Sequence, residues 1–354
     1  MLKFVLVGCG RIAKRHSELL GEKQIAGASL VGVCDVVEPK ARAIGARFSV
    51  PHFTDMHAMM KAVKPDVAVV LTESGLHAEH VVALAPHGAH IMVEKPMALT
   101  LADAEQMIQA CDRAGVKLFV IKQNRFNVPV LKAREALDAG RFGRLVMGTV
   151  RVRWCRGQDY YDQDPWRGTW ALDGGVLTNQ ASHHIDMLEW MMGDVESVFA
   201  MSRTALVNIE AEDTAVVSLR FANGALGVIE ATTATRPRDL EGSVSILGEG
   251  GTVVVGGFAM NKMETWSFAK PEPGDDQVMA RYSVNPPNVY GFGHQAYYEH
   301  VVDCIRNDKK QLVDGLEGRR SLELIMAIYE SIETGREVPL RFRPSRCRLG
   351  VRHG

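Results

Sequence analysis

The sequence predicts two domains: a doubly wound α/β domain with a parallel sheet, followed by an α+β domain with a large, mostly antiparallel open sheet. Short apolar runs alternate with helical stretches over residues 1–122, which is typical of a doubly wound sheet. Beyond residue 122, long β-rich segments follow one another without crossover helices, which indicates antiparallel pairing. A chain of 354 residues is long enough for two cores. We therefore divide it into residues 1–122, residues 123–340 and a basic tail at 341–354.

The first domain begins with an apolar strand at residues 3–7, followed by a Gly-x-Gly-x-x-Ala turn into a helix. Gly8 permits the tight turn, Gly10 lets a pyrophosphate approach the backbone, and Ala13 allows close packing of helix on strand. Free N–H groups at the start of the helix favour a phosphate. The turn therefore predicts a dinucleotide site, although small residues also occur at many ordinary strand-to-helix turns.

A second apolar strand, residues 30–34, ends on Asp35, about 25 residues after Gly10. This is close to the ~20 residues expected of the carboxylate that binds an adenosine ribose. A carboxylate accepts hydrogen bonds from two hydroxyls but repels a 2′-phosphate. The sequence therefore predicts NAD rather than NADP.

The remaining elements of this domain keep the same alternation. Strands are expected near 52–53 and at 67–71, 90–93 and 117–121, and helices at 38–48, 55–63 and 102–114. The run at 67–71 is apolar throughout, which indicates a sheet covered on both faces. His77 and His80 share a helix face after this strand, but no third ligand has matching spacing, so we expect no metal.

The strand at 90–93 ends on Glu94, Lys95 and Pro96. Ligands of open α/β sheets lie beyond the carboxyl ends of the strands, and a lysine is costly to place there unless the site uses it. Pro96 stops the strand and fixes where Lys95 points. The alternative is an ordinary surface Glu-Lys pair.

The second domain starts with Lys122-Gln123-Asn124-Arg125-Phe126 and a helix over 128–139. Strands are expected at 144–154, 195–205, 213–221, 225–233 and 244–255, and closing helices at 292–305 and 317–334. Asn223-Gly224 predicts a hairpin turn. Helices can cover one face of this sheet, and we expect the other face to meet a second subunit.

A second chemical stretch runs from Asp173 to Asp186. As a helix that opens at the glycines, it places Gly175, Asn179 and His183 on one stripe, which Asp186 and Trp190 continue. A histidine can accept the proton of a carbinol near neutral pH. The alternative is a capped core helix with a satisfied histidine. A metal is not favoured, because the adjacent His183 and His184 point apart.

Composition narrows the function further. The chain has 41 Lys and Arg against 42 Asp and Glu, so its overall charge favours neither nucleic acid nor an anionic membrane. No apolar run approaches the ~18 residues of a membrane span. Six scattered cysteines without a Cys-x-x-Cys pair indicate reduced thiols in a cytoplasmic protein. The arginine-rich tail is expected to be solvated or to contact a subunit.

Together, the glycine turn, Glu94-Lys95-Pro96 and the stretch around His183 resemble the Gfo/Idh/MocA oxidoreductase family over essentially the whole chain. The resemblance implies an NAD-binding Rossmann domain, an open-sheet second domain, dimers or tetramers, and Lys95 and His183 as the catalytic pair. The family often has aspartate at the position of Asn179, so an inositol-type specificity is not carried over.

A closer resemblance covers residues 71–75, 122–126 and 151–180. These segments are similar to bacterial UDP-2-acetamido-2-deoxy-glucuronate 3-dehydrogenases of surface-polysaccharide synthesis. Arginines suit a diphosphate or carboxylate, and aromatic rings suit stacking. The arginines are Arg153, Arg156 and Arg167, and the rings are Tyr160, Tyr161 and Trp166. For this run the alternative is plain surface strands and a loop.

The expected sites follow from the motifs and the resemblance. Cofactor contacts are expected from Gly8, Gly10, Arg11, Ile12, Asp35, Leu71, Thr72, Ser74, His77, Glu94, Lys95 and Gln123. Substrate contacts are expected from Lys95, Arg125, Arg153, Tyr160, Trp166, Arg167, Asn179 and His183. The resulting hypothesis is an NAD-dependent dehydrogenase of a nucleotide-linked uronic acid. The alternatives are a dehydrogenase of another sugar or cyclitol, a glycoside hydrolase that uses NAD transiently, and a non-catalytic sensor.

Overall fold

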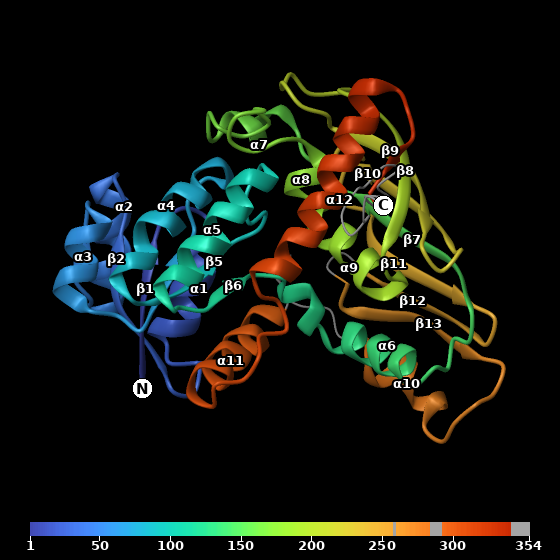
Figure 1. The fold of residues 1–354 in the computed structure, drawn as a ribbon, viewed down its shortest axis with the longest axis horizontal. Coiled ribbons are helices and arrows are strands. Elements are labelled where there is room, and N and C mark those ends of the chain that lie inside the picture. Colours follow the sequence, from blue (N-terminus) through green and yellow to red (C-terminus); the bar gives the residue numbers. More distant parts are fainter. Residues whose placement is uncertain (258–259, 284–291, 341–354) are drawn as a thin grey trace, which may run out of the picture.

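The structure, a computed structural model, describes residues 1–257, 260–283 and 292–340. Its first sheet has six parallel strands in the order β3-β2-β1-β4-β5-β6 (Figure 1). The strands are β1 (Leu2–Val7), β2 (Ala28–Cys34), β3 (His52–Phe53), β4 (Val67–Val70), β5 (His90–Val93) and β6 (Leu118–Val120). The strand order reverses between β1 and β4. Ligands of such sheets bind at this reversal, outside the carboxyl ends of the strands.

Helices cover both faces of this sheet, which explains why every residue of β4 is fully buried. They are α1 (Ala13–Gly21), α2 (Glu38–Phe48), α3 (Met56–Val63), α4 (His77–Leu84) and α5 (Leu101–Ala114). The side chain of Thr100 accepts the N–H of Asp103 at the start of α5, and Gly115, at φ +65°, ends the helix. The doubly wound first domain is confirmed.

A helix from late in the sequence, α11 (Gly293–Arg306), completes the first domain rather than the second. Its Tyr297 and Tyr298 are buried in one core with Phe4 and Phe119 of the sheet. The hydroxyl of Tyr297 also donates to the carbonyl of Val120, at the end of β6, over 2.8 Å. The division that we expected at residue 122 therefore does not describe the packing of α11.

The second sheet has eight strands in the order β13-β12-β11-β7-β10-β9-β8-β14. They are β7 (Leu145–Arg153), β8 (Val195–Arg203), β9 (Thr214–Phe221), β10 (Leu226–Thr232), β11 (Glu241–Gly248), β12 (Gly251–Gly256), β13 (Lys262–Phe268) and β14 (Val338–Pro339). Every neighbouring pair is antiparallel except β7 and β10, which run parallel. The mostly antiparallel sheet is confirmed.

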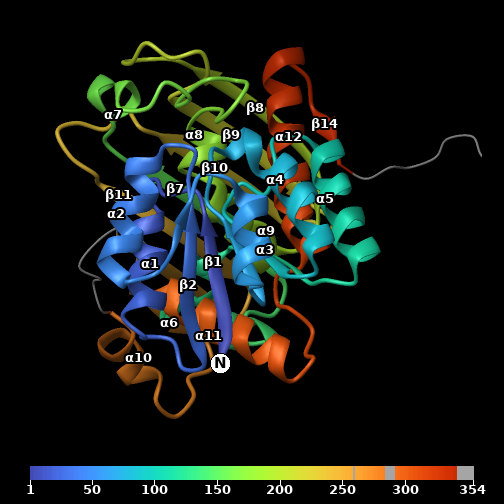
Figure 2. The ribbon, with the colours of Figure 1, turned by 90° about the vertical axis from the view of Figure 1, so that its left-hand side faces the viewer.

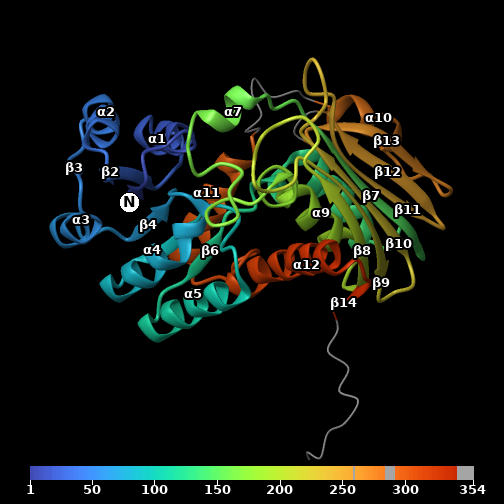
Figure 3. The same cartoon turned by 90° about the horizontal axis from the view of Figure 1, so that it is seen from above.

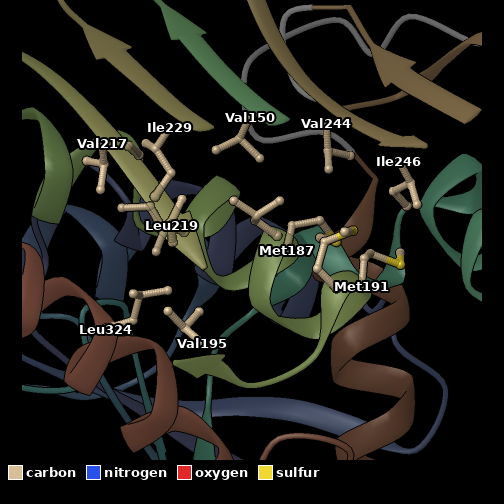
Figure 4. Close-up of a cluster of buried hydrophobic side chains, with 14 of the residues drawn as sticks. Val150, Met187, Met191, Val195, Val217, Leu219, Ile229, Val244, Ile246 and Leu324 are labelled. Carbon is tan, nitrogen blue, oxygen red and sulfur yellow. The ribbon is translucent and has the colours of Figure 1, made fainter. Parts of the chain in front are cut away.

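Two helices, α9 (Ser182–Met192) and α12 (Gly315–Thr334), cover the face of this sheet that points toward the first domain (Figure 3). Figure 4 shows Met187 and Met191 of α9 pointing at Val150, Val244 and Ile246 of the strands. The remaining described helices are α6 (Val128–Asp138), α7 (Gln158–Asp162), α8 (Val176–Asn179) and α10 (Asp275–Arg281).

The opposite face of the second sheet carries no covering element among the described residues. Side chains alternate along its strands, so Phe199, Met201 and Val216 are 41%, 64% and 47% exposed. Their inward-facing neighbours Ala200 and Val217 are buried. We call this surface the open face.

Two sequence-based expectations were wrong. The run at 244–255 is a hairpin of β11 and β12 rather than one strand, because glycines at 248, 250 and 251 turn the chain between them. The continuous helix from Gly175 to Asp186 is broken into α8 and α9 at Gln180 and Ala181.

The remaining expectations concern the basic tail, membrane spans and the cysteines. The basic tail lies outside the described residues. Among the described residues, no helix is long and apolar enough to span a membrane. The cysteines that the structure describes form no disulfide with one another.

Candidate active site

The glycine turn after β1 is fastened to the ends of two neighbouring strands. Gly8 lies at φ +97°, and a Cβ there would come within 2.8 Å of the Leu71 carbonyl group. An added Cβ on Gly10 would instead meet no atom within 4 Å. At the start of α1, no side chain caps the N–H groups. Open space before free N–H groups is what a pyrophosphate requires.

Asp35 directly follows β2, the strand that lies beside β1 in the first sheet. Figure 2 shows these two strands side by side. Its carboxylate accepts the backbone N–H of Cys9 over 2.7 Å and that of Val37 over 2.8 Å. These bonds fix the carboxylate beside the turn, where it can accept hydrogen bonds from a ribose diol.

The segment after β4 presents mainly its backbone to the turn. Leu71 and Thr72 pack against Gly8, and Ser74 is buried at the start of the following 3₁₀ turn. His77 is 1% exposed, with Nδ1 2.8 Å from the Pro96 carbonyl and Nε2 3.0 Å from the Thr72 carbonyl. The expected cofactor contact of the His77 side chain is therefore not supported. Its imidazole lies instead between the carbonyls of Pro96 and Thr72, to one of which its single N–H donates.

Lys95 follows β5 and reaches the second domain. Its Nζ donates to the carbonyl of Asn179, at the break between α8 and α9. Burial lowers the pKa of Lys95, while the carboxylates of Glu94 and Asp173 oppose that shift. The broken helix thus gives Lys95 a carbonyl to bind, four residues before His183.

His183 lies at the first turn of α9 and is 8% exposed. Its Nε2 is 3.0 Å from Nε2 of Gln123, while its Nδ1 is buried without a hydrogen-bond partner. Burial and the neighbouring positive charges of Lys95 and Lys122 hold the pKa of His183 well below its ordinary value. The imidazole is therefore neutral near pH 7 and able to accept a proton.

Asn179 and Asp173 complete this cluster. The amide of Asn179 donates to Asp173, which also accepts the N–H of Gly168 over 2.8 Å. Burial raises the pKa of Asp173, and these hydrogen bonds and the charge of Lys95 oppose the shift. Asp173 was not among the expected site residues. Its place directly before two glycines was the available signal.

Arg125 is placed differently from the expectation. It is 2% exposed and forms two 2.8 Å hydrogen bonds with Asp186 of α9. A further 2.9 Å ion pair joins it to Glu317. Because these carboxylates occupy its guanidinium, the expected substrate contact of Arg125 is not supported. The residue locks α9 in place instead.

Arg153 also lies away from its expected place at the domain junction. It projects from β7 onto the open face, where it pairs with Glu230 over 2.6 and 2.7 Å. Its neighbour Val152 is buried beneath the covering helices. Successive strand residues alternate between faces, so Arg153 points away from the junction of the domains. The expected substrate contact is not supported for this reason.

The loop around α7 supplies the aromatic and basic side chains. Arg167 stacks on Tyr160 and on Trp166, with 4.7 Å to each ring centroid, and donates to the Tyr160 hydroxyl over 2.7 Å. Arg11 of the glycine turn lies over Tyr160 and donates to Gln163. The loop therefore connects the cofactor turn with the second domain, as Figure 3 shows for α7 and α1.

Known families match almost the whole chain. The model "Oxidoreductase family, NAD-binding Rossmann fold" matches residues 2–122. The model "Oxidoreductase family, C-terminal alpha/beta domain" matches residues 134–340. The chain belongs to the GFO/IDH/MocA oxidoreductase family.

Several members of the family resemble this chain over nearly its full length. The WlbA dehydrogenase of Bordetella pertussis, solved with NADH and UDP-GlcNAcA, is 44% identical, with a TM-score of 0.89 and coverage of 97% of this chain and 99% of that one. The WlbA dehydrogenase of Chromobacterium violaceum, solved with the same ligands, is 41% identical, with a TM-score of 0.90 and coverage of 97% of each chain. Myo-inositol 2-dehydrogenase of Thermotoga maritima is 31% identical, with 96% of this chain and 98% of that one covered.

These findings establish the general activity. The protein is an NAD-dependent oxidoreductase of a family of sugar and cyclitol dehydrogenases. The open space at Gly10, the uncapped start of α1 and the fixed carboxylate of Asp35 fit this cofactor.

Proposed function

We propose that the protein oxidises C3 of UDP-2-acetamido-2-deoxy-D-glucuronate (UDP-GlcNAcA), with NAD as the hydride acceptor. The observation that carries this proposal is the meeting of Lys95 with the Asn179–His183 segment at the domain junction. It is supported by the higher identity to two dehydrogenases solved with this sugar nucleotide than to the myo-inositol dehydrogenase. We place the reaction in the cytoplasm, in surface-polysaccharide synthesis.

In this mechanism two side chains handle the proton and the charge of the carbinol. Neutral His183 accepts the hydroxyl proton. NAD held at Gly10 and Asp35 would supply the hydride acceptor. The ammonium group of Lys95, with two donors beyond its bond to Asn179, stabilises the developing alkoxide. Gln123 keeps the imidazole in place by its contact with His183.

The nucleotide end of the substrate is assigned to the loop around α7. Arg156 and Arg167 both lie over the ring of Tyr160, at 5.5 and 4.7 Å. Guanidinium groups bind diphosphates and carboxylates in bidentate fashion, and an aromatic ring offers a stacking surface. Remote binding energy of this kind can position the sugar carbon for hydride transfer.

The test compares substrates by the absorbance of NADH. UDP-GlcNAcA is expected to be oxidised with a far higher kcat/KM than N-acetylglucosamine, glucose or myo-inositol. A higher kcat/KM for myo-inositol or a free hexose would refute the sugar-nucleotide assignment and leave the dehydrogenase standing. Release of an aglycone from a glycoside, without net NADH, would instead support the hydrolase.

A cyclitol or another free sugar is the second candidate substrate. It is favoured by the 31% identity to a myo-inositol 2-dehydrogenase over almost the full chain. An Arg167→Ala variant separates the two candidates. It is expected to raise KM for a sugar nucleotide, whereas oxidation of a small cyclitol would be nearly unchanged.

We also propose a homo-oligomer, a tetramer or a dimer, that uses the open face. The exposed apolar side chains of Phe199, Met201 and Val216 lie there on neighbouring strands. Multi-angle light scattering would give the mass. Met201→Glu is expected to lower it, and a native protein that is monomeric at micromolar concentration would refute the proposal.

A further inference from the structure

Next to Lys95, a buried group of polar side chains lies between α1, the end of β5 and α11. It consists of His16 on α1, Glu94 after β5, and His294 and Tyr298 on α11, and none of the four is more than 6% exposed. Buried polar groups carry a desolvation cost that is offset only when they are paired. Four of them beside a catalytic candidate call for a functional explanation.

The contacts in this group form a chain that ends at Lys95. The Tyr298 hydroxyl is 2.7 Å from Nδ1 of His16, and Nε2 of His16 is 3.1 Å from Oε1 of Glu94. The other carboxylate oxygen of Glu94 accepts the backbone N–H of Lys95 over 3.0 Å. Nε2 of His294 lies 3.6 Å from Oε1 of Glu94.

One arrangement of protons satisfies the whole chain. A neutral imidazole has one donor and one acceptor nitrogen. If Tyr298 donates to Nδ1 of His16, Nε2 carries the proton and donates to Glu94. The carboxylate is then an acceptor for His16 and for the backbone of Lys95. Each hydrogen bond therefore fixes which atom donates and which accepts in the next one.

The charge on Glu94 follows from the same contacts. Burial alone would raise its pKa, but hydrogen bonds and charge from His16 and His294 outweigh burial and hold the pKa well below its ordinary value. Burial lowers the pKa of His16, which keeps that imidazole neutral. A fixed negative charge therefore lies beside Lys95, whose own pKa it raises against the effect of burial.

We propose that Tyr298, His16 and Glu94 form a buried hydrogen-bonded relay that positions Lys95 and keeps a counter-charge behind its ammonium group. This inference rests on the role proposed for Lys95. It makes the three side chains positioning residues, because they act through Lys95. It also gives α11 a function, since residues 1–122 alone would lack Tyr298 and His294.

Other titratable and charged groups act on Glu94 or Lys95 as well. They are His77, Lys122, Arg167, Asp173, His183 and Tyr297, besides His16, His294 and Tyr298. Lys122 and Arg167 lower the pKa of Lys95, and Asp173 raises it. Glu94 also raises the pKa of His183, so its removal affects both catalytic candidates in the same direction.

The decisive test is the pH dependence of kcat/KM in Glu94→Gln. The rising limb reports loss of a proton from His183, and the falling limb reports loss from Lys95. Without the carboxylate both pKa values fall, so both limbs are expected to move about one pH unit toward acid. Glu94→Asp, which keeps the charge, is expected to return the limbs close to their native positions. A lower rate with unmoved limbs in Glu94→Gln would overturn the inference.

Lys95→Met separates this result from the role of Lys95 itself. If the falling limb persists in Lys95→Met, the limb does not belong to Lys95 and the proposed catalytic role fails. If it disappears there but does not move in Glu94→Gln, only the relay fails.

A matched pair on α11 tests the relay without removing a charge. Tyr298→Phe breaks the bond to His16, whereas Tyr297→Phe breaks an equally buried bond of 2.8 Å to the Val120 carbonyl. Tyr298→Phe is expected to lower kcat several-fold with unchanged NAD affinity, and Tyr297→Phe to leave kcat near native. Equal losses would overturn the inference, because both would then reflect packing of α11. His16, Glu94 and His294 could instead hold a metal ion, since their ligand atoms lie within 4.8 Å of one another. Stoichiometric zinc in the purified protein that is lost in Glu94→Gln would therefore also overturn the inference.

Discussion

The two sheets of this molecule are built from similar apolar strands but differ in how many faces they bury. The parallel sheet is covered on both faces, so its polar side chains are confined to strand ends such as Asp35 and Lys95. The antiparallel sheet is covered on one face, so charged residues such as Glu230 of β10 occur within a strand. A polar residue at the end of a strand that is covered on both faces therefore indicates function, whereas one within a strand that is covered on one face does not.

The largest expected effect on the rate concerns Lys95 and His183, which lie where the two domains meet. His183→Asn is expected to lower the rate by roughly 10²–10⁴-fold, the usual range for loss of a general base. Lys95→Met is expected to cost at least as much, because a positive charge beside the alkoxide is lost. NAD titration should remain near native in His183→Asn, since the expected cofactor contacts include Gly8, Gly10 and Asp35 but not His183. Near-native turnover by folded His183→Asn would place the proton acceptor at Lys95 or His184.

A second pair of variants compares a carboxylate on the covered side with one on the open face. Asp186→Asn removes the carboxylate that pairs with both buried Arg125 and buried Lys122, leaves Arg125 with Glu317, and is expected to cost about 3–5 kcal/mol of unfolding free energy. Glu230→Gln, beside Arg153, is expected to cost about 0–1 kcal/mol. Urea unfolding measures both. Equal losses would mean that another subunit buries the open face in solution.

The effect of pH on stability also has opposite signs for two buried carboxylates, Asp186 and Glu212. Nearby positive charges hold the pKa of Asp186 below its unfolded value of about 3.9, so its stabilisation is present above pH 4 and is lost toward acid. Burial raises the pKa of Glu212 to about 7, so its contribution is lost as the pH rises from about 4.3 to 7. Glu212→Gln is therefore expected to raise stability by about 1–3 kcal/mol at pH 8 and little at pH 4.

Thermal unfolding across pH tests this expectation for Glu212. Its carboxylate accepts the N–H of Leu177 and the hydroxyl of Tyr329, bonds that an amide oxygen can also accept. Tyr329→Phe is the control, because it removes one of these bonds and leaves the charge. A variant that is less stable than the native protein at pH 8 would show that the carboxylate is needed in its charged form.

The smallest effect is expected for Asp35, which follows β2 of the first sheet. Asp35→Ser removes the charge that repels a 2′-phosphate and is expected to narrow the preference for NAD over NADP by roughly tenfold. Affinities for both cofactors, measured by fluorescence titration, check this. Native protein that binds NADP as well as NAD would show that Asp35 does not select the cofactor.

The motifs predicted the first domain well because their meaning is local. A tight turn needs Gly8, and a strand that ends on Asp35 or Lys95 places that side chain at the edge of the sheet whatever follows. The second domain was harder. The strands β7 to β10 were predicted, but β13 and β14 were missed. The hairpin of β11 and β12 was merged into one strand, since an apolar run does not show where it turns.

What the sequence alone determined is the doubly wound domain and its cofactor, while Lys95 and His183 stay a prediction for the catalytic pair. Only the tertiary structure decided which partners each side chain has. Arg125 and Arg153 looked like anion ligands in the sequence, but Asp186 and Glu230 meet them across 61 and 77 residues. The relay of Tyr298, His16 and Glu94 joins residues up to 282 positions apart. Charge and hydrogen-bonding capacity belong to a residue type, whereas their use depends on neighbours that only the folded chain brings together.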